Sequence, residues 1–183
     1  MSEPSLPGKI VALAEALDAA RIPHAFGGAL ALAYYAEPRA TIGIDLNLFL
    51  PPPEHGAVEK ALAGLEVEAK QDPSEPRSDG QCRWWWGTTP LDLFFAYDPI
   101  HEAMREGTRR VPFGEDRIRV LGPEHLLVCK VAFDRPKDWL DIEQMVLLTP
   151  ELDRDEVERW LGRLLAPDDP RHVRLGGIWR APP

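Results

Sequence analysis

The chain has 183 residues, of which 44% are hydrophobic, which suits one compact domain with or without a short helical extension and leaves little room for two full domains. Its 30 acidic and 21 basic residues give a formal charge of −9, so the surface as a whole repels nucleic acid. A polyanionic partner therefore has to bind at a local basic patch.

Cysteine usage and hydropathy bear on where the protein works. Cys82 and Cys129 lie far apart without metal-ligand spacing, which favours a reduced intracellular protein over a disulfide or zinc framework. The N-terminus has no basic stretch followed by an apolar run, and no segment approaches the roughly 18 apolar residues of a membrane span. We therefore expect a cytoplasmic protein with no membrane partner.

The first quarter of the chain alternates between helical and extended patterns. Apolar residues recur at helical spacing from about 7 to 20, and the turn Gly27-Gly28 leads into a helix-forming stretch over 29–35. Residues 41–48 alternate between apolar and polar side chains, which predicts a strand with Ile42 on its apolar face and Asp45 on its polar face.

The middle of the chain reads as a helix followed by hairpins. Helical spacing returns over about 54–64, before a short strand near 65–69. The hydrophobic runs 82–86 and 91–96 predict an antiparallel hairpin with a four-residue loop, Gly87 to Pro90. After a short helix near 99–106, a second hairpin is expected from residues 109–113 and 117–121.

The C-terminal part is mainly helical. Three helices are predicted over 123–133, 137–148 and 154–164, followed by a Pro/Arg-rich tail that is left unassigned. The order of elements predicts an α+β fold. We expect residues 1–122 to form the core and 123–183 a C-terminal helical extension and tail, packed with the core as one unit.

The glycine pair and two aspartates are the strongest candidates for chemistry. A Gly27-Gly28 turn lets backbone N–H groups approach an anion, and the following helix N-terminus adds about half a positive charge. Asp45 and Asp92 lie on separate strands, and carboxylates that converge from adjacent strands suit Mg²⁺, which also takes water and phosphate oxygens. The alternatives are a simple tight turn, a solvent-facing Asp45, and an Asp92 that caps a turn or pairs with an arginine.

The order of these residues resembles a known family. Gly27 to Ala31, then Arg39 and Thr41, then Ile44-Asp45-Leu46, is similar to the minimal nucleotidyltransferases of polymerase-beta-like fold, which include toxins of bacterial toxin–antitoxin systems. Asp92 matches the strand that carries the third carboxylate of that family. Three C-terminal stretches, 123–130, 135–138 and 141–143, resemble its helical signature. The whole resemblance covers roughly residues 8–148.

The resemblance implies a mixed sheet flanked by helices, with a helical C-terminal half, and a nucleotidyltransferase that moves a nucleoside monophosphate from an NTP to an acceptor with Mg²⁺. In this reading Asp45 and Asp92 hold the metal, and Asp92 also takes the proton of the acceptor. Lys130 neutralises phosphate charge or, alternatively, forms an exposed salt bridge. The other implied nucleotide-binding residues are Gly27, Gly28, Arg39 and Thr41. The implied supporting residues are Arg135, Lys137, Asp138 and Asp141. The two aspartates either orient Lys130 or the substrate, or simply favour the helix dipole.

The chain departs from the family at Gly43. The family pattern has two aspartates that flank one residue of the strand, and Gly43 stands at the first of these positions. Loss of one ligand weakens at least one site of a two-metal centre, so restoring Asp at this position is expected to raise Mg²⁺ affinity. Asn47, two residues beyond Asp45, is a poor substitute. Gly43 fits a degenerate enzyme, a variant made to disarm one, or a branch with a different metal arrangement.

Several questions of function stay open at this stage. The toxin branch suggests a tRNA end or a protein hydroxyl as acceptor and an antitoxin as partner, while a small molecule such as an aminoglycoside fits equally well. The alternative function is a degenerate, non-catalytic protein of this fold that binds a nucleotide or a protein partner, and a purely structural module ranks last. Trp84 and Trp86 are expected in the core with Trp85 opposite, against a base-stacking role. The densest basic stretch fits either an RNA backbone or a solvated hairpin face; it comprises Arg105, Arg109, Arg110, Arg117 and Arg119.

Overall fold

The computed structural model of the chain describes residues 3–68 and 80–180. In chain order the elements are α1 (Leu6–Ala19), β1 (His24–Phe26), α2 (Gly28–Leu32), β2 (Ile44–Leu48), η1 (Pro52–Glu54), α3 (His55–Leu62), η2 (Ala63–Leu65), β3 (Val67–Glu68), β4 (Gln81–Trp86), β5 (Thr89–Phe95), α4 (Ile100–Glu106), β6 (Arg109–Phe113), β7 (Asp116–Val120), α5 (Pro123–Phe133), α6 (Pro136–Leu148), α7 (Arg154–Leu164) and α8 (Pro170–Arg180). This is the predicted α+β class.

The elements group into two compact units. The first unit combines Met1–Leu30 with Ala40–Leu121 and contains the sheet. The second combines Ala31–Arg39 with Gly122–Pro183 and contains the C-terminal helices. Arg39 therefore groups with the C-terminal helices, whereas Thr41 groups with the sheet.

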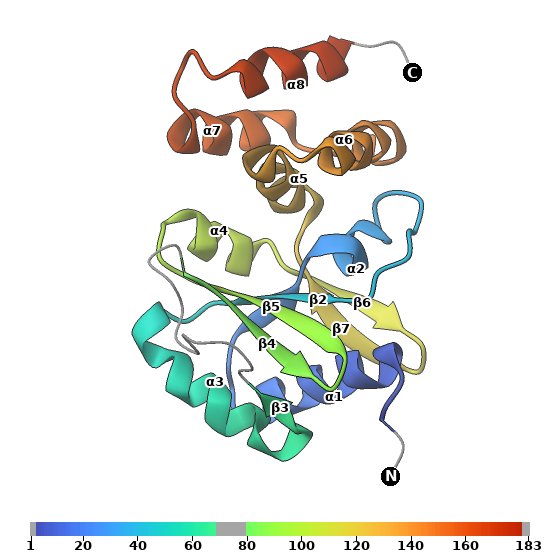
Figure 1. Cartoon of the computed structure of the whole chain (residues 1–183). Helices are drawn as coiled ribbons and strands as arrows, with labels where there is room; N and C mark the ends of the chain where they lie inside the picture. The colour runs from blue at the N-terminus through green and yellow to red at the C-terminus, as the bar shows by residue number, and fades with distance from the viewer. Residues whose placement is uncertain (1–2, 69–79, 181–183) are drawn as a thin grey trace. The chain divides into compact units, whose positions relative to one another are not determined.

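The described strands of the first unit form one mixed sheet in the order β3-β4-β5-β2-β1-β7-β6 (Figure 1). Strand β2 runs parallel to β5, and β1 runs parallel to β7. The other neighbours are antiparallel, including β4 with β5 and β1 with β2. This arrangement places β5 between the tryptophan-rich strand β4 and the Asp45 strand β2.

One face of this sheet is packed and the other carries polar groups. In β5 burial alternates strictly, with Leu91, Leu93 and Phe95 fully buried and Asp92 between them half-buried. Helices α1 and α3 contact each other and lie on the same side of the sheet (Figure 1). Because side chains of a strand alternate between its faces, Asp92 lies on the face opposite to that of the buried leucines.

The hairpin of β4 and β5 differs from its prediction. The loop has two residues, Gly87 and Thr88, rather than four, and Thr89 and Pro90 extend β5. Gly87 has φ +59°, as a glycine at the first position of a type II′ hairpin turn requires. The Thr89 hydroxyl is also held in place, because the Lys9 ammonium donates to it at 2.7 Å.

The start of β2 also differs from its prediction. The strand begins at Ile44 rather than Thr41. The Thr41 hydroxyl accepts a hydrogen bond from the Gly43 N–H at 3.3 Å and donates to the Gly43 carbonyl at 3.1 Å, so a local turn replaces the strand ladder here. Ile42 consequently leaves the apolar face and is 82% exposed.

The second unit is helical. Helices α5, α6 and α7 match the predicted segments, with α6 beginning one residue earlier at Pro136. Helix α5 packs against α6 and α7, and α6 packs against α8 (Figure 1). The tail left unassigned by the sequence forms α8 as far as Arg180, because Leu175 is fully buried. Within the described residues, no helix is long and apolar enough to cross a membrane.

The buried Lys9 of α1 gives a test of the first unit. Its side chain is 3% exposed, and its ammonium contacts Glu3, the Trp86 carbonyl at 2.9 Å and the Thr89 hydroxyl. Replacing it by Met leaves the carbonyl without this donor, so we expect Lys9→Met to lower the free energy of unfolding by about 1–3 kcal/mol in urea titrations. Lys60→Met, at an exposed position of α3, is the control and should change it by less than about 0.5 kcal/mol. Equal effects of the two variants would contradict the structural role of Lys9.

Candidate functional site

A row of four residues crosses four neighbouring strands on the polar face of the sheet. Arg83 of β4 is the register partner of Asp92 in β5, and Asp92 is the register partner of Asp45 in β2. The Gly27 N–H, just after β1, donates to the Asp45 carbonyl at 2.9 Å. Adjacent strands lie about 4.8 Å apart, so the two carboxylates arise side by side on parallel strands. The row of Arg83, Asp92, Asp45 and Gly27 is called the polar row below.

The glycine turn is shaped around Asp45. Gly28 has φ +52°, and a Cβ at this position would lie 1.8 Å from Asp45 Oδ2. At Gly27, a Cβ would lie 2.8 Å from Asn47 Nδ2. Only glycine allows the chain to come this close to the carboxylate. Helix α2 ends at Leu32 instead of residue 35, so its dipole is weaker than the sequence predicts. The main property of the turn is therefore that its backbone can be approached closely by another group.

The position of the missing carboxylate lies beside Pro90. A Cβ at Gly43 would lie 3.2 Å from Pro90 Cγ and 3.4 Å from the Pro90 carbonyl oxygen. Asn47 does not fill this role, because it is 7% exposed and its amide donates to the Ala25 carbonyl at 3.4 Å. The polar row therefore contains two carboxylates.

Arg83 is the residue of this site that the sequence did not reveal. Its Nε donates to Asp92 Oδ1 at 2.6 Å and its Nη2 to Asp92 Oδ2 at 2.9 Å. The hydrogen bonds to Asp92, the charge of Asp92 and then the charge of Asp45 raise the pKa of the Arg83 guanidinium. The two-residue turn pairs Asp92 with Arg83, whereas the predicted four-residue loop places Trp85 opposite Asp92. The alternative in which Asp92 pairs with an arginine is thus the one observed.

The donor set of the polar row fits a single Mg²⁺ better than a pair. Asp45 and Asp92 supply hard carboxylate oxygens from adjacent strands. Among the described residues there is no group of three or more His, Cys, Asp or Glu side chains that could hold a metal ion. Mg²⁺ is commonly bound by one or two carboxylates together with water and substrate phosphates, which matches this pair.

The remaining predicted residues form an ion-pair network in the second unit. Lys130 is 3% exposed, and its ammonium lies 2.6 Å from Asp141 Oδ2 and 3.8 Å from Asp138 Oδ1. The Arg39 guanidinium donates to both oxygens of Asp141 at 3.2 Å, and Arg135 donates to both oxygens of Asp138 at 2.6 and 3.1 Å. Lys130 is thus buried, which excludes the exposed salt bridge offered as its alternative role.

Asp138 also lies in the first turn of α6, where its charge favours the helix dipole as the alternative reading expects. Asp138 accepts a hydrogen bond from the Arg135 N–H at 3.3 Å in a capping box, while also facing Lys130. Lys137 lies at an exposed position of the same helix turn. The structure therefore joins Arg39, Lys130, Arg135, Asp138 and Asp141, and leaves Lys137 outside their ion pairs.

The aromatic and basic motifs are used mainly in packing and local pairs. Trp84 and Trp86 are buried, as the core assignment predicts, and the half-buried Trp85 lies on the face of the polar row. Arg105 pairs with Glu102 and Arg119 with Asp18. Two residues of the basic stretch are therefore already engaged by carboxylates.

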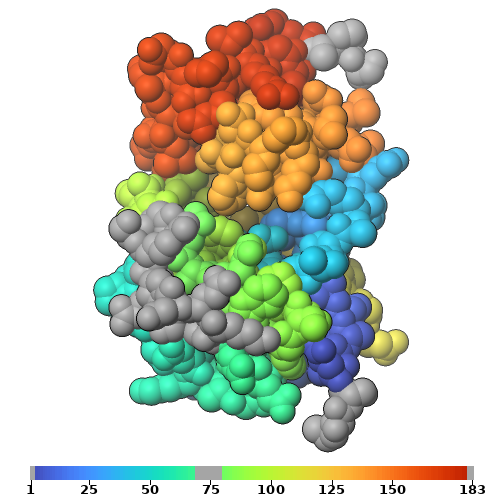
Figure 2. All heavy atoms as spheres, in the orientation of Figure 1, coloured from blue at the N-terminus to red at the C-terminus, as the bar shows by residue number. Residues whose placement is uncertain are grey.

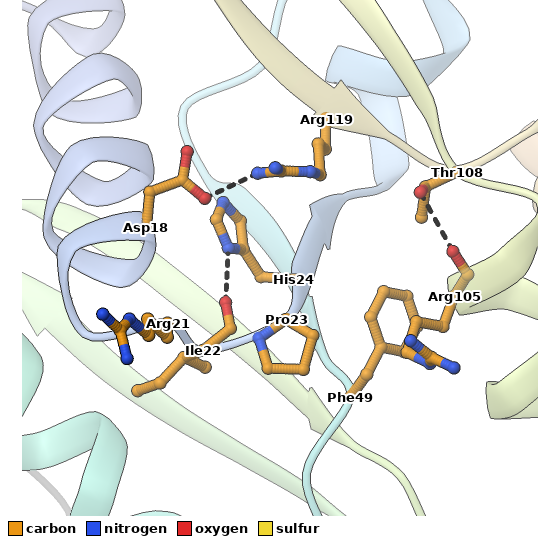
Figure 3. A pocket seen from close by; sticks show the side chains of 9 residues that line it. All are labelled: Asp18, Arg21, Ile22, Pro23, His24, Phe49, Arg105, Thr108 and Arg119. Carbon is orange, nitrogen blue, oxygen red and sulfur yellow. Dashed lines mark hydrogen bonds and ion pairs between the residues drawn. The ribbon is translucent and has the colours of Figure 1, made fainter.

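Arg105 and Arg119 also line a cavity of about 420 Å³ at the start of β1 (Figure 3). His24 of its wall hydrogen-bonds through Nδ1 to the Ile22 carbonyl at 2.9 Å, and burial lowers the pKa of its imidazole. Since β1 runs from His24 to Phe26, this cavity lies at the opposite end of that strand from Gly27. It is separate from the polar row.

The fold that carries the polar row is that of the nucleotidyltransferases. No family model matches the sequence, and no curated protein matches it. Among solved structures, the solution structure of the antibiotic-resistance factor ANT(2'')-Ia is similar with a TM-score of 0.64 and 18% identity, over 97% of this chain and 96% of that chain. A nucleotidyltransferase-like protein from Paracoccidioides brasiliensis gives 0.55 and 17%, over 96% and 92%. A putative nucleotidyltransferase from H. pylori gives 0.52 and 18%, over 98% and 95%. The predicted fold is confirmed.

Gly28 can be tested by a single methyl group. Gly28→Ala adds a Cβ where Asp45 Oδ2 lies and forces a non-glycine residue into the left-handed region, so we expect a loss of at least about 1–2 kcal/mol in the free energy of unfolding. Gly56→Ala in α3 is the control, because a Cβ there meets nothing within 4 Å. Urea unfolding of both variants decides the matter, and a Gly28→Ala protein as stable as the control would show that Asp45 does not need this approach.

Lys130 can be tested by removing its charge. Lys130→Met removes the buried ammonium from Asp141 and Asp138, which are 6% and 0% exposed, but Arg39 and Arg135 still contact them, so we expect a loss of about 1–3 kcal/mol in the free energy of unfolding. Lys137→Met, on the same helix turn as Asp138, should change it by less than about 0.5 kcal/mol. A loss below about 1 kcal/mol for Lys130→Met would contradict the buried network.

Proposed function

We propose that this protein binds an NTP at the polar row and transfers the nucleoside monophosphate to an acceptor, releasing pyrophosphate. The observation that carries the proposal is the side-by-side placement of Asp45 and Asp92 on parallel strands next to the Gly28 turn. The fold supports it, since ANT(2'')-Ia, which is similar to this chain, has been crystallised with adenylyl-2''-tobramycin.

In this proposal each group has a simple task. The Gly27-Gly28 turn receives phosphate oxygens at the backbone N–H groups that follow Gly27, whose own N–H is used by the Asp45 carbonyl, and Thr41 orders the chain before β2. Asp45 and Asp92 hold Mg²⁺, and Asp92 is also the candidate acceptor of the proton from the attacking hydroxyl. Bound Mg²⁺ neutralises phosphate charge and orients the triphosphate.

The resemblance also implies a phosphate-binding role for the ion-pair network, and this role is proposed for the second unit by itself. Three cations, Arg39, Lys130 and Arg135, face two carboxylates, so the network carries one net positive charge. Lys130 is buried, whereas the Arg39 and Arg135 side chains are 35% and 51% exposed. Within the second unit we therefore propose the network as a whole as the group that neutralises phosphate charge, with Lys130 as its centre and Asp138 and Asp141 as its orienting groups.

The acceptor is proposed by class. The tobramycin adduct of ANT(2'')-Ia favours a small polyhydroxylated molecule, and the resemblance to toxin nucleotidyltransferases favours an RNA end or a protein hydroxyl, with an antitoxin as partner and a cytoplasmic location. A hydroxyl is common to all three classes. It is the group that attacks the α-phosphate in each.

A second candidate function is nucleotide or protein binding without catalysis. Two observations favour it: Gly43 removes one carboxylate, and the Arg83 guanidinium occupies both oxygens of Asp92. Such a protein binds an NTP without transferring it, or binds a protein partner.

Calorimetric titration with each of the four NTPs, with Mg²⁺ and with EDTA, tests the proposal. We expect one NTP to bind more tightly with Mg²⁺, and Asp45→Asn to reduce that affinity by about tenfold or more, because a charged oxygen ligand is lost. Asp116→Asn, at an exposed position of β7, is the control for the loss of one negative charge.

The outcomes separate the two candidates. Transfer of label from a radioactive NTP to an added acceptor, lost in Asp45→Asn, supports catalysis and excludes the non-catalytic protein. Binding with no transfer to RNA, protein or small-molecule acceptors supports the non-catalytic protein. Absence of binding by any NTP contradicts nucleotidyl transfer and leaves the binding of a protein partner as the non-catalytic function.

A further inference from the structure

The polar row contains a cation of its own, Arg83, beside its two carboxylates. With Gly43 in place of a carboxylate, Asp45 and Asp92 contribute two negative charges and Arg83 one positive charge, which leaves one net negative charge. One Mg²⁺ turns this into one net positive charge, which suits a polyphosphate. A second divalent ion would have to compete with the guanidinium for Asp92.

The geometry of Arg83 makes that competition direct. Both oxygens of Asp92 accept from the guanidinium in a parallel pair of hydrogen bonds, at 2.6 and 2.9 Å. A bidentate pair of this kind is stronger and more directional than a single contact. Arg83 is thus fixed in orientation by Asp92, whose remaining lone pairs can serve the one Mg²⁺ that it shares with Asp45 but would have to be divided again for a second metal ion.

Arg83 still has donors to offer. Its Nε and one N–H of Nη2 are used by Asp92, so the Nη1 edge of the planar fork stays for another acceptor. Its side chain is 53% exposed, and atoms of β4 and β5 reach the surface on the side seen in Figure 2. Phosphate oxygens match the spacing of a guanidinium fork.

We propose that Arg83 is a built-in cation that replaces the second metal ion of this site, holding Asp92 with one edge and the NTP phosphates with the other. This inference rests on the proposed function. It assigns to the protein a site for one Mg²⁺ and one guanidinium. It also explains why position 43 carries no carboxylate, because a third negative charge beside Asp45 is required only when a second metal ion has to be bound.

A merely structural ion pair is the competing explanation, and it makes different predictions. Exposed ion pairs contribute little to folding, so Arg83→Gln is expected to stay folded and to leave urea unfolding nearly unchanged. The variant therefore reports on ligand binding rather than on stability. Arg110→Gln, at an exposed position of β6, is the matched control for the loss of one arginine.

The test is calorimetric titration of the full chain with the NTP that binds most tightly among the four, at a series of Mg²⁺ concentrations and also without Mg²⁺ in EDTA. We expect the unchanged protein and Arg110→Gln to keep weak binding in EDTA, and Arg83→Gln to lose it by about tenfold or more, since a charge-assisted contact to phosphate is removed. Wild-type affinity of Arg83→Gln at every Mg²⁺ concentration would overturn the inference and leave the proposed function standing. Absence of NTP binding by the unchanged protein overturns both.

Restoring the missing carboxylate gives a second, independent readout. Gly43→Asp fits with a shift of a few tenths of an ångström at Pro90. While Arg83 holds Asp92, we expect the Gly43→Asp variant to take up one Mg²⁺ ion for each NTP bound, as shown by the dependence of NTP affinity on Mg²⁺ concentration. In Gly43→Asp combined with Arg83→Gln, Asp92 is released and the dependence should rise toward two Mg²⁺. A dependence on two ions in Gly43→Asp alone would contradict the replacement of a metal by Arg83.

Discussion

The hydrogen-bonded register of β5 between β4 and β2 is the constraint on which the candidate site depends. It aligns Arg83, Asp92 and Asp45 in one row and turns all three toward the same face. Side chains alternate along a strand, so a slip of one residue in either pairing would send one of these groups to the packed face. The buried side of β5, with Leu91 and Leu93, resists such a slip because it would expose the core.

Charge pairing is the second theme of the structure, and it takes a different form in each unit. On the sheet, the Arg83–Asp92 pair is half-exposed, contributes little to folding and stays open to a ligand. Among the helices, Lys130 and its two aspartates are almost completely buried, and Arg39 and Arg135 contact the same aspartates from more exposed positions. The first pair is suited to a function in binding, and the second to holding the helices and their exposed arginines in position.

The similarity to ANT(2'')-Ia and to the H. pylori protein extends over nearly the whole chain at 18% identity, and it defines the fold. One fold supports many acceptors, so the chemistry has to be argued from the site. Here that site has two carboxylates, a glycine turn that only glycine can form, and a guanidinium next to them. Compared with the pattern of the nucleotidyltransferase family, this site has fewer carboxylates and one additional fixed positive charge.

Local sequence determined much of this protein. Helices α5 to α7 follow from apolar spacing and from Pro123 and Pro136 at helix starts, and the Gly27-Gly28 turn and the polar face at Asp45 follow from local conformational preference and period-two alternation. The Arg83–Asp92 pair was decided by the tertiary structure, because a loop shorter by two residues changes every cross-strand partner. The burial of Lys130 also required the packed helices. So did its link through Asp141 to Arg39, since Arg39 and Asp141 are 102 residues apart along the chain. A sequence pattern reports the preference of neighbouring residues, whereas the partner of a charge depends on which distant segment packs beside it.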